Sequence, residues 1–326
     1  MSLSKRCAYL GVAIILCAFA IRTVLHWGEL QSPDGAKLLT YFYTGRWPEI
    51  NAPDKDTEPE QAPLPTHPEY TGKGPLQLSL QAGVSVNCNN TTQYKTELEQ
   101  WLLEPLEWNL KGEEPTVLII HTHATESYRN FGQYKESDPY HTTTKKHNML
   151  AVGDKVAEIL EANGISVVHE RSLHDYPAYR NAYDRSRANA QAYLDRYPSI
   201  TLILDLHRDA VTDADGEFIP LSATYEGKTA AKIELVVGTD GSGQTHDNWE
   251  KNAAMAVKMH GVLEEEFPGI CRPMLVRGSR YNQDLLPGAI LVEMGSAGNT
   301  LEEALVSAEV LANVIIKMAS GVEVTP

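Results

Sequence analysis

The sequence is poor in cysteine and in basic charge, and it contains a single long apolar run. Four cysteines occur in 326 residues and none are spaced as C-x-x-C, which excludes a disulfide-rich scaffold and a cysteine zinc knuckle. Lysine and arginine total 28 against 43 acidic residues, giving a formal net charge of -15. Because nucleic-acid binders need a basic face to displace counterions, this balance argues against that class. One apolar run also excludes a polytopic membrane protein.

Several familiar catalytic motifs are missing as well. The sequence has no G-x-S-x-G nucleophile elbow, no H-E-x-x-H, no Walker loop and no glycine-rich dinucleotide fingerprint after its first buried strand. The segment Gly295–Gly298 has the wrong spacing for such an elbow. A serine hydrolase, a P-loop enzyme and a nicotinamide-dependent dehydrogenase are therefore disfavoured.

The apolar run lies at the amino-terminal end. Cys7–Ile21 is free of charge and flanked by basic residues. A membrane span needs about 20 apolar residues, so the run spans a bilayer only if residues 23–27 extend it. A cleaved signal peptide is the alternative, because Ala18–Ala20 fits the small-x-small cleavage pattern. Both interpretations export the rest of the chain, and we expect a single-pass cell-membrane anchor with an extracytoplasmic catalytic domain.

Composition divides the chain into three parts. Seven of the 18 prolines fall between Pro48 and Pro75, which predicts a semi-rigid spacer without a core. The expected parts are an anchor or signal segment, a Pro-rich extracytoplasmic spacer and a catalytic domain, at residues 1–27, 28–75 and 76–326. Within the last part we expect residues 76–110 to be irregular apart from a short helix near Thr96–Leu103, and the core to lie at 114–320.

From Thr116 onward, buried strands alternate with helices. Continuous aliphatic runs predict strands, at residues 117–120, 165–168, 200–206, 233–237 and 289–292. Apolar residues at helical spacing predict helices, at residues 149–160, 179–194, 249–267 and 301–315. Thr300 and Glu303 form a capping box before the last helix. This alternation predicts a three-layer α/β domain with a mostly parallel sheet and helices on both faces.

Polar side chains gather where three of these strands end. In open parallel sheets, ligands and catalytic groups lie beyond the carboxyl ends of the strands. Imidazoles with a carboxylate make a three-ligand zinc site that leaves a fourth position for water. The expected ligands are His123, Glu126 and His207, with His121 as the alternative first ligand.

Two further acids follow from the same pattern. Glu293 is expected to act as the general base on the water, which describes amide hydrolysis without a covalent intermediate. Asp205 is expected to orient an imidazole rather than to bind the ion itself. The other histidines, including His260, are taken as structural or surface residues.

Long strings of the sequence carry a resemblance to a known family. VLIIHTHATESY, HERSLHDYPAYRNAYDRSR, YPSITLILDLHRDA and GAILVEMGSAGNTLEEA occur in order within roughly residues 114–320. They resemble the stage II sporulation protein P family, whose members are membrane-anchored peptidoglycan hydrolases of endospore-forming bacteria. The resemblance implies a fold similar to zinc-dependent N-acetylmuramoyl-L-alanine amidases, and more broadly to zinc carboxypeptidases.

The resemblance also implies an activity and partners. It implies cleavage of the amide between muramic acid and L-alanine, cross-link endopeptidase activity, and work in engulfment beside the stage II sporulation proteins D and M. It matches His207 to a zinc-ligand region and Glu293 to the catalytic glutamate, and it favours His123 over His121. The zinc glutamate of the amidases lies where this chain has Lys145–His147, so the assignment of Glu126 rests on the H-x-x-E spacing.

The remaining predictions concern residues that contact the substrate and alternatives to the amidase activity. Arg280, Tyr281 and Asn282, before the last strand, are candidates for gripping the substrate. The alternatives to the amidase are a zinc peptidase of the carboxypeptidase type that trims stem peptides, and a wall-binding module without turnover. Whether Cys88 and Cys271 pair is left open.

Overall fold

The computed structural model describes residues 76–326 apart from positions 82, 132, 136, 137, 323 and 326. The anchor and the spacer predicted for residues 1–75 lie outside the described residues. No helix in the described part combines the length and apolarity that a membrane crossing requires.

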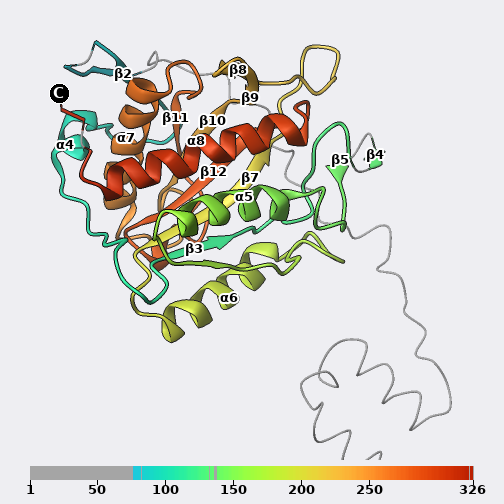
Figure 1. Cartoon of the computed structure of the whole chain (residues 1–326), viewed down its shortest axis with the longest axis horizontal. Helices are drawn as coiled ribbons and strands as arrows, with labels where there is room; N and C mark the ends of the chain where they lie inside the picture. Colours follow the sequence, from blue (N-terminus) through green and yellow to red (C-terminus); the bar gives the residue numbers. More distant parts are fainter. Residues whose placement is uncertain (1–75, 82, 132, 136–137, 323, 326) are drawn as a thin grey trace, which may run out of the picture. The chain divides into compact units, whose positions relative to one another are not determined.

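A mixed eight-stranded sheet forms the middle of the described part (Figure 1). In spatial order its strands are β1 (Leu76–Ser79), β2 (Ser85–Asn90), β11 (Met274–Arg277), β10 (Ile233–Gly238), β12 (Ala289–Ser296), β7 (Leu202–Asp209), β3 (Val117–Ile120) and β6 (Val167–His169). Only β1 with β2 and β10 with β12 pair antiparallel, whereas the other neighbours are parallel. The predicted mostly parallel sheet is confirmed.

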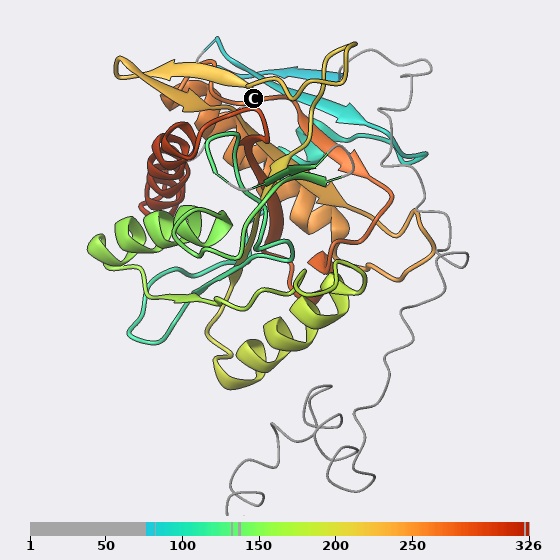
Figure 2. The ribbon, with the colours of Figure 1, turned by 90° about the vertical axis from the view of Figure 1, so that its right-hand side faces the viewer.

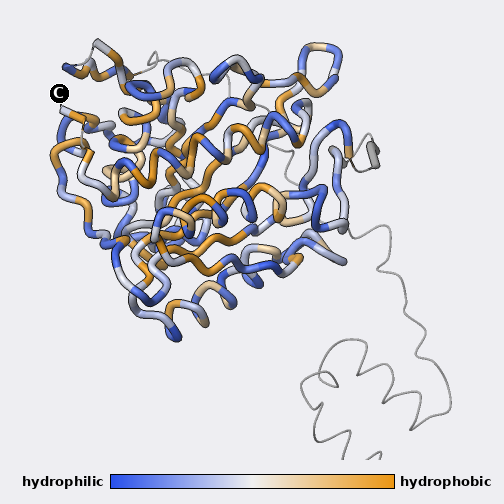
Figure 3. The backbone as a smooth tube through the Cα atoms, in the orientation of Figure 1, coloured by the Kyte–Doolittle hydropathy of each residue, from blue (hydrophilic) through white to orange (hydrophobic). Residues whose placement is uncertain are grey.

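Helices cover both faces of this sheet, as predicted. α6 (Ala182–Arg196) covers one face, which we call the α6 face, and packs in a small core that includes Ala190 and Ile203. The opposite face carries the larger core and the helices α5 (Met149–Ala162), α7 (Trp249–Glu266) and α8 (Leu301–Ala319). Figure 2 shows the yellow-green α6 on one side of the strands and the green α5 and red α8 on the other. Hydrophobic residues, orange in Figure 3, concentrate in the central strands and in α8.

The helix boundaries follow from local capping. The predicted capping box is present at α8, where the Thr300 hydroxyl accepts from the Glu303 amide and the Glu303 carboxylate accepts from the Thr300 amide. At α5 the Asn148 side chain accepts from the Leu150 amide. The predicted start of the next helix at residue 179 is too early, because α6 begins only after Asn181, whose φ is 62°.

The expectation that residues 76–110 are irregular apart from one helix was wrong. The helix exists as α4 (Leu98–Leu103), but β1 and β2 precede it and extend the sheet by two strands. β1 is a short edge strand whose residues alternate between half-buried and exposed, so it lacks the continuous aliphatic run of a central strand.

Other short elements had also not been predicted. Besides β11, these are the hairpins β4 (Gln133–Lys135) with β5 (Asp138–His141) and β8 (Ser222–Tyr225) with β9 (Lys228–Ala231), and the 3-10 helix η1 (Gln283–Leu285). The strands β7 and β12 are longer at their carboxyl ends than predicted. As a result His207 and Glu293 lie within strands, where the pleat fixes the face on which each side chain projects.

Candidate metal centre and active site

His207 and Glu293 lie side by side on two central strands. They are register partners in the parallel pair β7–β12, and neighbouring strands lie about 4.8 Å apart. The adjacent residues Leu206, Val292 and Met294 pack in the larger core. Since successive side chains alternate between faces, His207 and Glu293 both project on the α6 face.

The His207 ring lies between two carboxylates. Its Nδ1 is 3.5 Å from Oε2 of Glu126. Its Nε2 is 2.9 Å from Oδ1 of Asp205, although off the direction of a regular hydrogen bond. Burial alone would lower the pKa of His207, but Asp205 first and Glu126 second hold it well above the ordinary value. The ring is therefore a cation held by two anions.

His123 approaches the same place from the loop after β3. Its ring meets that of His207 edge to face, with centroids 5.3 Å apart, and stacks on Tyr179 with centroids 4.3 Å apart. Its Nδ1 is buried and has no hydrogen-bond partner. Burial lowers the pKa of His123 to about 4, which keeps the imidazole neutral at pH 7 and a nitrogen lone pair available.

Glu126 is buried beside both rings. Its Oε2 accepts the backbone N–H of Arg208 at 3.2 Å, and the Arg208 guanidinium lies 3.6 Å from Oε1. Burial would raise the pKa of Glu126, but Arg208 and then His207 hold it well below the usual range. The backbone carbonyl of Glu126 accepts a hydrogen bond from the amide of Met149 at 3.1 Å. This bond holds the Glu126 backbone beside the residue that begins α5.

Asp205 is fixed by the loop that carries His123. Its Oδ1 accepts the Thr122 amide at 2.8 Å and its Oδ2 accepts the Thr122 hydroxyl at 2.7 Å. Burial would raise the pKa of Asp205, but His207 and Thr122 lower it to about 2. A fixed carboxylate against one ring nitrogen holds an imidazole in one orientation, which is the geometry that the predicted orienting role requires.

Glu293 is the one acid of the group that is not held by a cation at hydrogen-bond distance. Its Oε2 is buried without a hydrogen-bond partner. Burial, followed by the charge of Asp209, raises the pKa of Glu293 well above its usual range, and His207 opposes this only in part. The protonated form of the Glu293 carboxyl is therefore favoured over what an exposed glutamate would show, and a positive charge nearby would favour the ionised form.

An arginine organises the acids behind Glu293. Arg272 contacts Asp209 at 2.8 Å and Glu234 at 3.2 Å, and Glu234 is the register partner of Glu293 across β10–β12. Burial raises the pKa of Glu234 to about 7 although Arg272 opposes the shift. Sequence patterns do not reveal this network, because its members are far apart in the chain.

The residues present fit a divalent cation. Two imidazoles and two carboxylates lie near one another, and three of their buried atoms, Nδ1 of His123, Nε2 of His207 and Oε2 of Glu293, have no hydrogen-bond partner of regular geometry among the described residues. A cation would give such atoms a partner. Donor atoms of His123, Glu126 and His207 are not all within 4.8 Å of one another, so an ion would have to draw them together.

His121 and His147 lie outside this cluster. Nδ1 of His121 is 3.0 Å from the Leu206 carbonyl and its Nε2 is 2.8 Å from Nε2 of His169, so both ring nitrogens are engaged. The His147 ring stacks on Phe131 with centroids 3.9 Å apart.

The predicted substrate-gripping residues are already bound within the fold. The Asn282 amide donates to the Tyr183 carbonyl at 2.8 Å and so ties its loop to α6. Nε of Arg280 lies 3.1 Å from Asp284, and the Tyr281 ring lies 6.0 Å from that of Tyr183. A role of Arg280 and Asn282 in substrate binding stays a prediction.

Sequence reasoning missed two side chains that shape the site. Arg208 directly follows His207, and its guanidinium also donates to the Ser127 carbonyl at 3.0 Å, which holds the Glu126 loop against β7. Tyr179, taken as a helix residue, instead lies before α6 and stacks on His123. The position of Arg208 directly after His207 in the sequence could have signalled the role of Arg208. No comparable signal pointed to Tyr179.

The chain has an α/β fold in which imidazoles and carboxylates gather at the carboxyl ends of strands in a mostly parallel sheet. The model of the stage II sporulation protein P family matches residues 54–316, and the chain belongs to that family. It is 32% identical to the stage II sporulation protein P of Bacillus subtilis (strain 168) over 222 residues, in a match that covers 64% of this chain and 52% of the relative. The chain thus matches about half the length of that relative.

Solved structures of amidases resemble the chain distantly. An N-acetylmuramyl-L-alanine amidase from Mycobacterium smegmatis is 14% identical with a TM-score of 0.41, and the match covers 66% of this chain and 100% of that one. The catalytic domain of an N-acetylmuramoyl-L-alanine amidase from Bacillus (Paenibacillus) polymyxa var. colistinus is 14% identical with a TM-score of 0.37, covering 63% and 98%. Likenesses at this level carry no argument about the chemistry of this chain.

Proposed function

We propose that the chain is a zinc-dependent peptidoglycan hydrolase that cleaves the amide between muramic acid and L-alanine. The observation that carries the proposal is the pairing of His207 with Glu293 on adjacent strands, with Glu126 and His123 both beside the His207 ring. Membership of the stage II sporulation protein P family supports peptidoglycan as the substrate and sporulation as the setting.

Each residue of the cluster has one task in this mechanism. His123, Glu126 and His207 would hold zinc, which would supply a Lewis acid and lower the pKa of a water to about 7. Glu293, whose Oε2 has no other partner, would accept the proton of the attacking water and deliver it to the leaving amide nitrogen.

The remaining contacts keep these groups in place. Asp205 restrains His207 through Nε2 and leaves Nδ1, on the side of Glu126, as the ligand atom. Arg208 holds Glu126 ionised. Tyr179 covers one flat face of the His123 ring, which limits its rotation and its exposure to water.

The setting proposed for the enzyme follows the predictions for residues 1–75. The segment 1–27 would anchor the chain in the cell membrane with the catalytic domain outside the cytoplasm. There it would act on cell-wall peptidoglycan during engulfment, beside the stage II sporulation proteins D and M. Cross-link endopeptidase activity is a further part of the proposal.

Product analysis tests the proposal. Purified full-length chain, loaded with zinc, is incubated with purified peptidoglycan sacculi, and the soluble products are identified by mass spectrometry. Free stem peptides that begin with L-alanine are expected. Trimmed stem peptides that remain attached to muramic acid would favour the carboxypeptidase alternative, and binding to sacculi without any product would favour the wall-binding module. Either result overturns the amidase assignment.

A further inference from the structure

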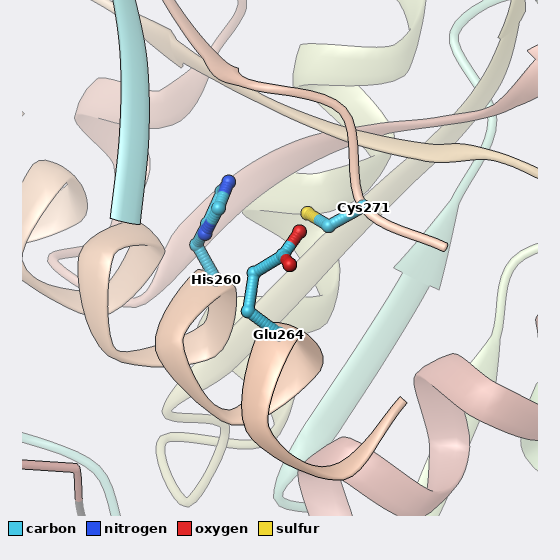
Figure 4. A group of neighbouring side chains, drawn as sticks. All are labelled: His260, Glu264 and Cys271. Atoms are coloured by element: carbon cyan, nitrogen blue, oxygen red, sulfur yellow. The ribbon is translucent and has the colours of Figure 1, made fainter. Parts of the chain in front are cut away.

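A second group of metal-ligating side chains lies in helix α7 and just beyond it. His260 and Glu264 are four residues apart on the helix, and therefore on one side of it, and Cys271 follows in the loop before β11. One ligand atom from each of the three residues lies within 4.8 Å of the other two. Figure 4 shows the Glu264 carboxylate pointing toward the Cys271 sulfur, with the His260 ring beside them.

This group is on the opposite side of the sheet from the candidate active site. Cys271 belongs to the larger core, under α7. The next residue, Arg272, reaches Asp209 and Glu234, which belong to the cluster around Glu293. Consecutive residues of an extended segment project to opposite faces, so the two groups share a backbone segment and no side chain.

The backbone around Cys271 is held firmly. The Ile233 amide donates to the Ile270 carbonyl at 3.0 Å, and the Arg272 amide donates to the Ile233 carbonyl at 2.8 Å. Cys271 thus forms a parallel bridge with Ile233 at the start of β10. Its thiol is carried by this hydrogen-bonded segment and the other two groups by one helix, so little chain entropy is left to lose when a ligand joins them.

His260 is the unsatisfied member of the group. Its side chain is completely buried, and neither ring nitrogen has a hydrogen-bond partner of regular geometry. Burial lowers the pKa of His260 to about 4, and the nearby Arg272 backbone opposes this only in part. A buried polar group without a hydrogen-bond partner destabilises the fold, and a bound ligand would relieve that cost. The ring is therefore neutral at pH 7 and presents a free lone pair.

The other two members are acids in a poorly hydrated place. Burial and then the Glu264 charge raise the pKa of the Cys271 thiol well above its ordinary value. Burial also raises the pKa of Glu264. Lys232 is near enough to lower both pKa values, but not enough to cancel the shifts. A divalent cation beside these groups would favour the ionised forms of both the Cys271 thiol and the Glu264 carboxyl.

We propose that His260, Glu264 and Cys271 form a second metal site that binds a zinc-type divalent cation. Imidazole nitrogen, carboxylate oxygen and thiolate sulfur are the three donor types that zinc accepts, whereas magnesium and calcium prefer oxygen alone. Binding releases the Cys271 thiol proton to solvent and leaves the fourth tetrahedral position to water.

The ion would join the last turns of α7 to Cys271 on one face of the sheet. The following residue, Arg272, holds Asp209 and Glu234 beside Glu293 on the other face. The backbone of residues 271 and 272 would therefore link the metal site to the acids near Glu293. The site does not depend on the proposed hydrolase activity, because its ligands are separate from His123, Glu126 and His207.

Cobalt(II) tests the proposal without an activity assay. Metal-free full-length chain is titrated with cobalt while the thiolate-to-cobalt charge-transfer absorption is followed. The candidate active site offers only nitrogen and oxygen, so this band reports the sulfur site alone. We expect the band in the wild type and in His207→Ala, and its loss in Cys271→Ser and in His260→Gln.

Matched controls remove the other thiols. A variant with Cys7, Cys17 and Cys88 replaced by serine keeps Cys271 as the sole thiol and is expected to keep the band. Cobalt-edge X-ray absorption of this variant should show a sulfur neighbour at about 2.3 Å, which needs no ligand variant that could fail to fold. Absence of the sulfur neighbour, or a band that persists in Cys271→Ser, would overturn the proposal.

Discussion

Glu293 and His207 are register partners on neighbouring parallel strands, and both side chains project on the face of the sheet that α6 covers. The same position therefore receives a buried acid whose pKa is raised and an imidazole already flanked by two carboxylates. A divalent cation between them would favour the ionised form of Glu293 and the neutral form of His207. In the proposed hydrolase this exchange of charge would make Glu293 available as a base.

Replacing Glu293 with Gln should abolish hydrolysis and leave metal binding intact. The amide keeps the volume of the side chain and removes the group that takes the proton, so turnover on peptidoglycan should fall by at least about a hundredfold. Zinc content is measured by elemental analysis and turnover by release of stem peptides. Near-normal turnover of the Gln variant would place the base elsewhere.

Replacing His207 with Ala should instead remove the metal of the active site. The variant loses one of three ligands, and it also leaves Asp205 and Glu126 without the ring between them. Zinc affinity at this site should fall by at least about a hundredfold, measured by competition with a chromophoric chelator. His147→Ala is the matched control, because that ring stacks on Phe131 outside the cluster and its loss should leave the affinity unchanged.

Stability should fall in acid because of Glu170. Its Oε2 is 2.7 Å from Nε2 of His174 and its Oε1 accepts the Ser172 amide at 2.9 Å. Burial would raise the pKa of Glu170, but these hydrogen bonds lower it from 4.5 to about 2. A lowered folded-state pKa contributes stability that is complete above the unfolded value and is lost as pH falls through the folded value.

The wild type should therefore lose about 2 kcal/mol of unfolding free energy between pH 5 and 2 through this group, after allowance for solvent screening. Urea denaturation at several pH values, on wild type and Glu170→Gln, isolates the contribution as the difference between the two curves. A difference that does not change with pH in this window would show that Glu170 has an ordinary pKa.

Arg272 should be required for the stability of the acids near Glu293. Replacing it with Met would leave Asp209 and Glu234 without their shared cation, and breaking a buried ion pair from one side costs about 3–5 kcal/mol. Thermal unfolding followed by circular dichroism measures the loss. Adding Glu234→Gln to the Met variant should recover part of it, and no recovery would mean that the loss comes from packing instead.

The sequence predicted the fold well where chain patterns are continuous. The aliphatic runs at Val117–Ile120 and Ile233–Val237 could be identified as buried strands because both of their faces are covered. The capping box at Thr300 gave the start of α8 to the residue. The edge strand β1 and its neighbour β2 were missed because their residues alternate between more and less buried positions and form no continuous aliphatic run.

The sequence predicted a set of candidate site residues but not their geometry. Strand ends indicated His123, His207 and Glu293, because parallel strands deliver their carboxyl ends to one edge. Which of His121 and His123 faces the cluster depends on where β3 ends and its loop turns, and the structure places His121 against Leu206 and His169. Arg272 could not be predicted, since its partners Asp209 and Glu234 meet it only through the order of the strands.

Crystals of the zinc-loaded protein, measured at the zinc absorption edge, would locate the metal of the proposed active site. We expect an anomalous peak within about 2.0–2.2 Å of a nitrogen of His123, a nitrogen of His207 and an oxygen of Glu126, with the Glu293 carboxylate one water away. A zinc ion held by His121 and His169, or the absence of any peak between β7 and the loop after β3, would contradict it.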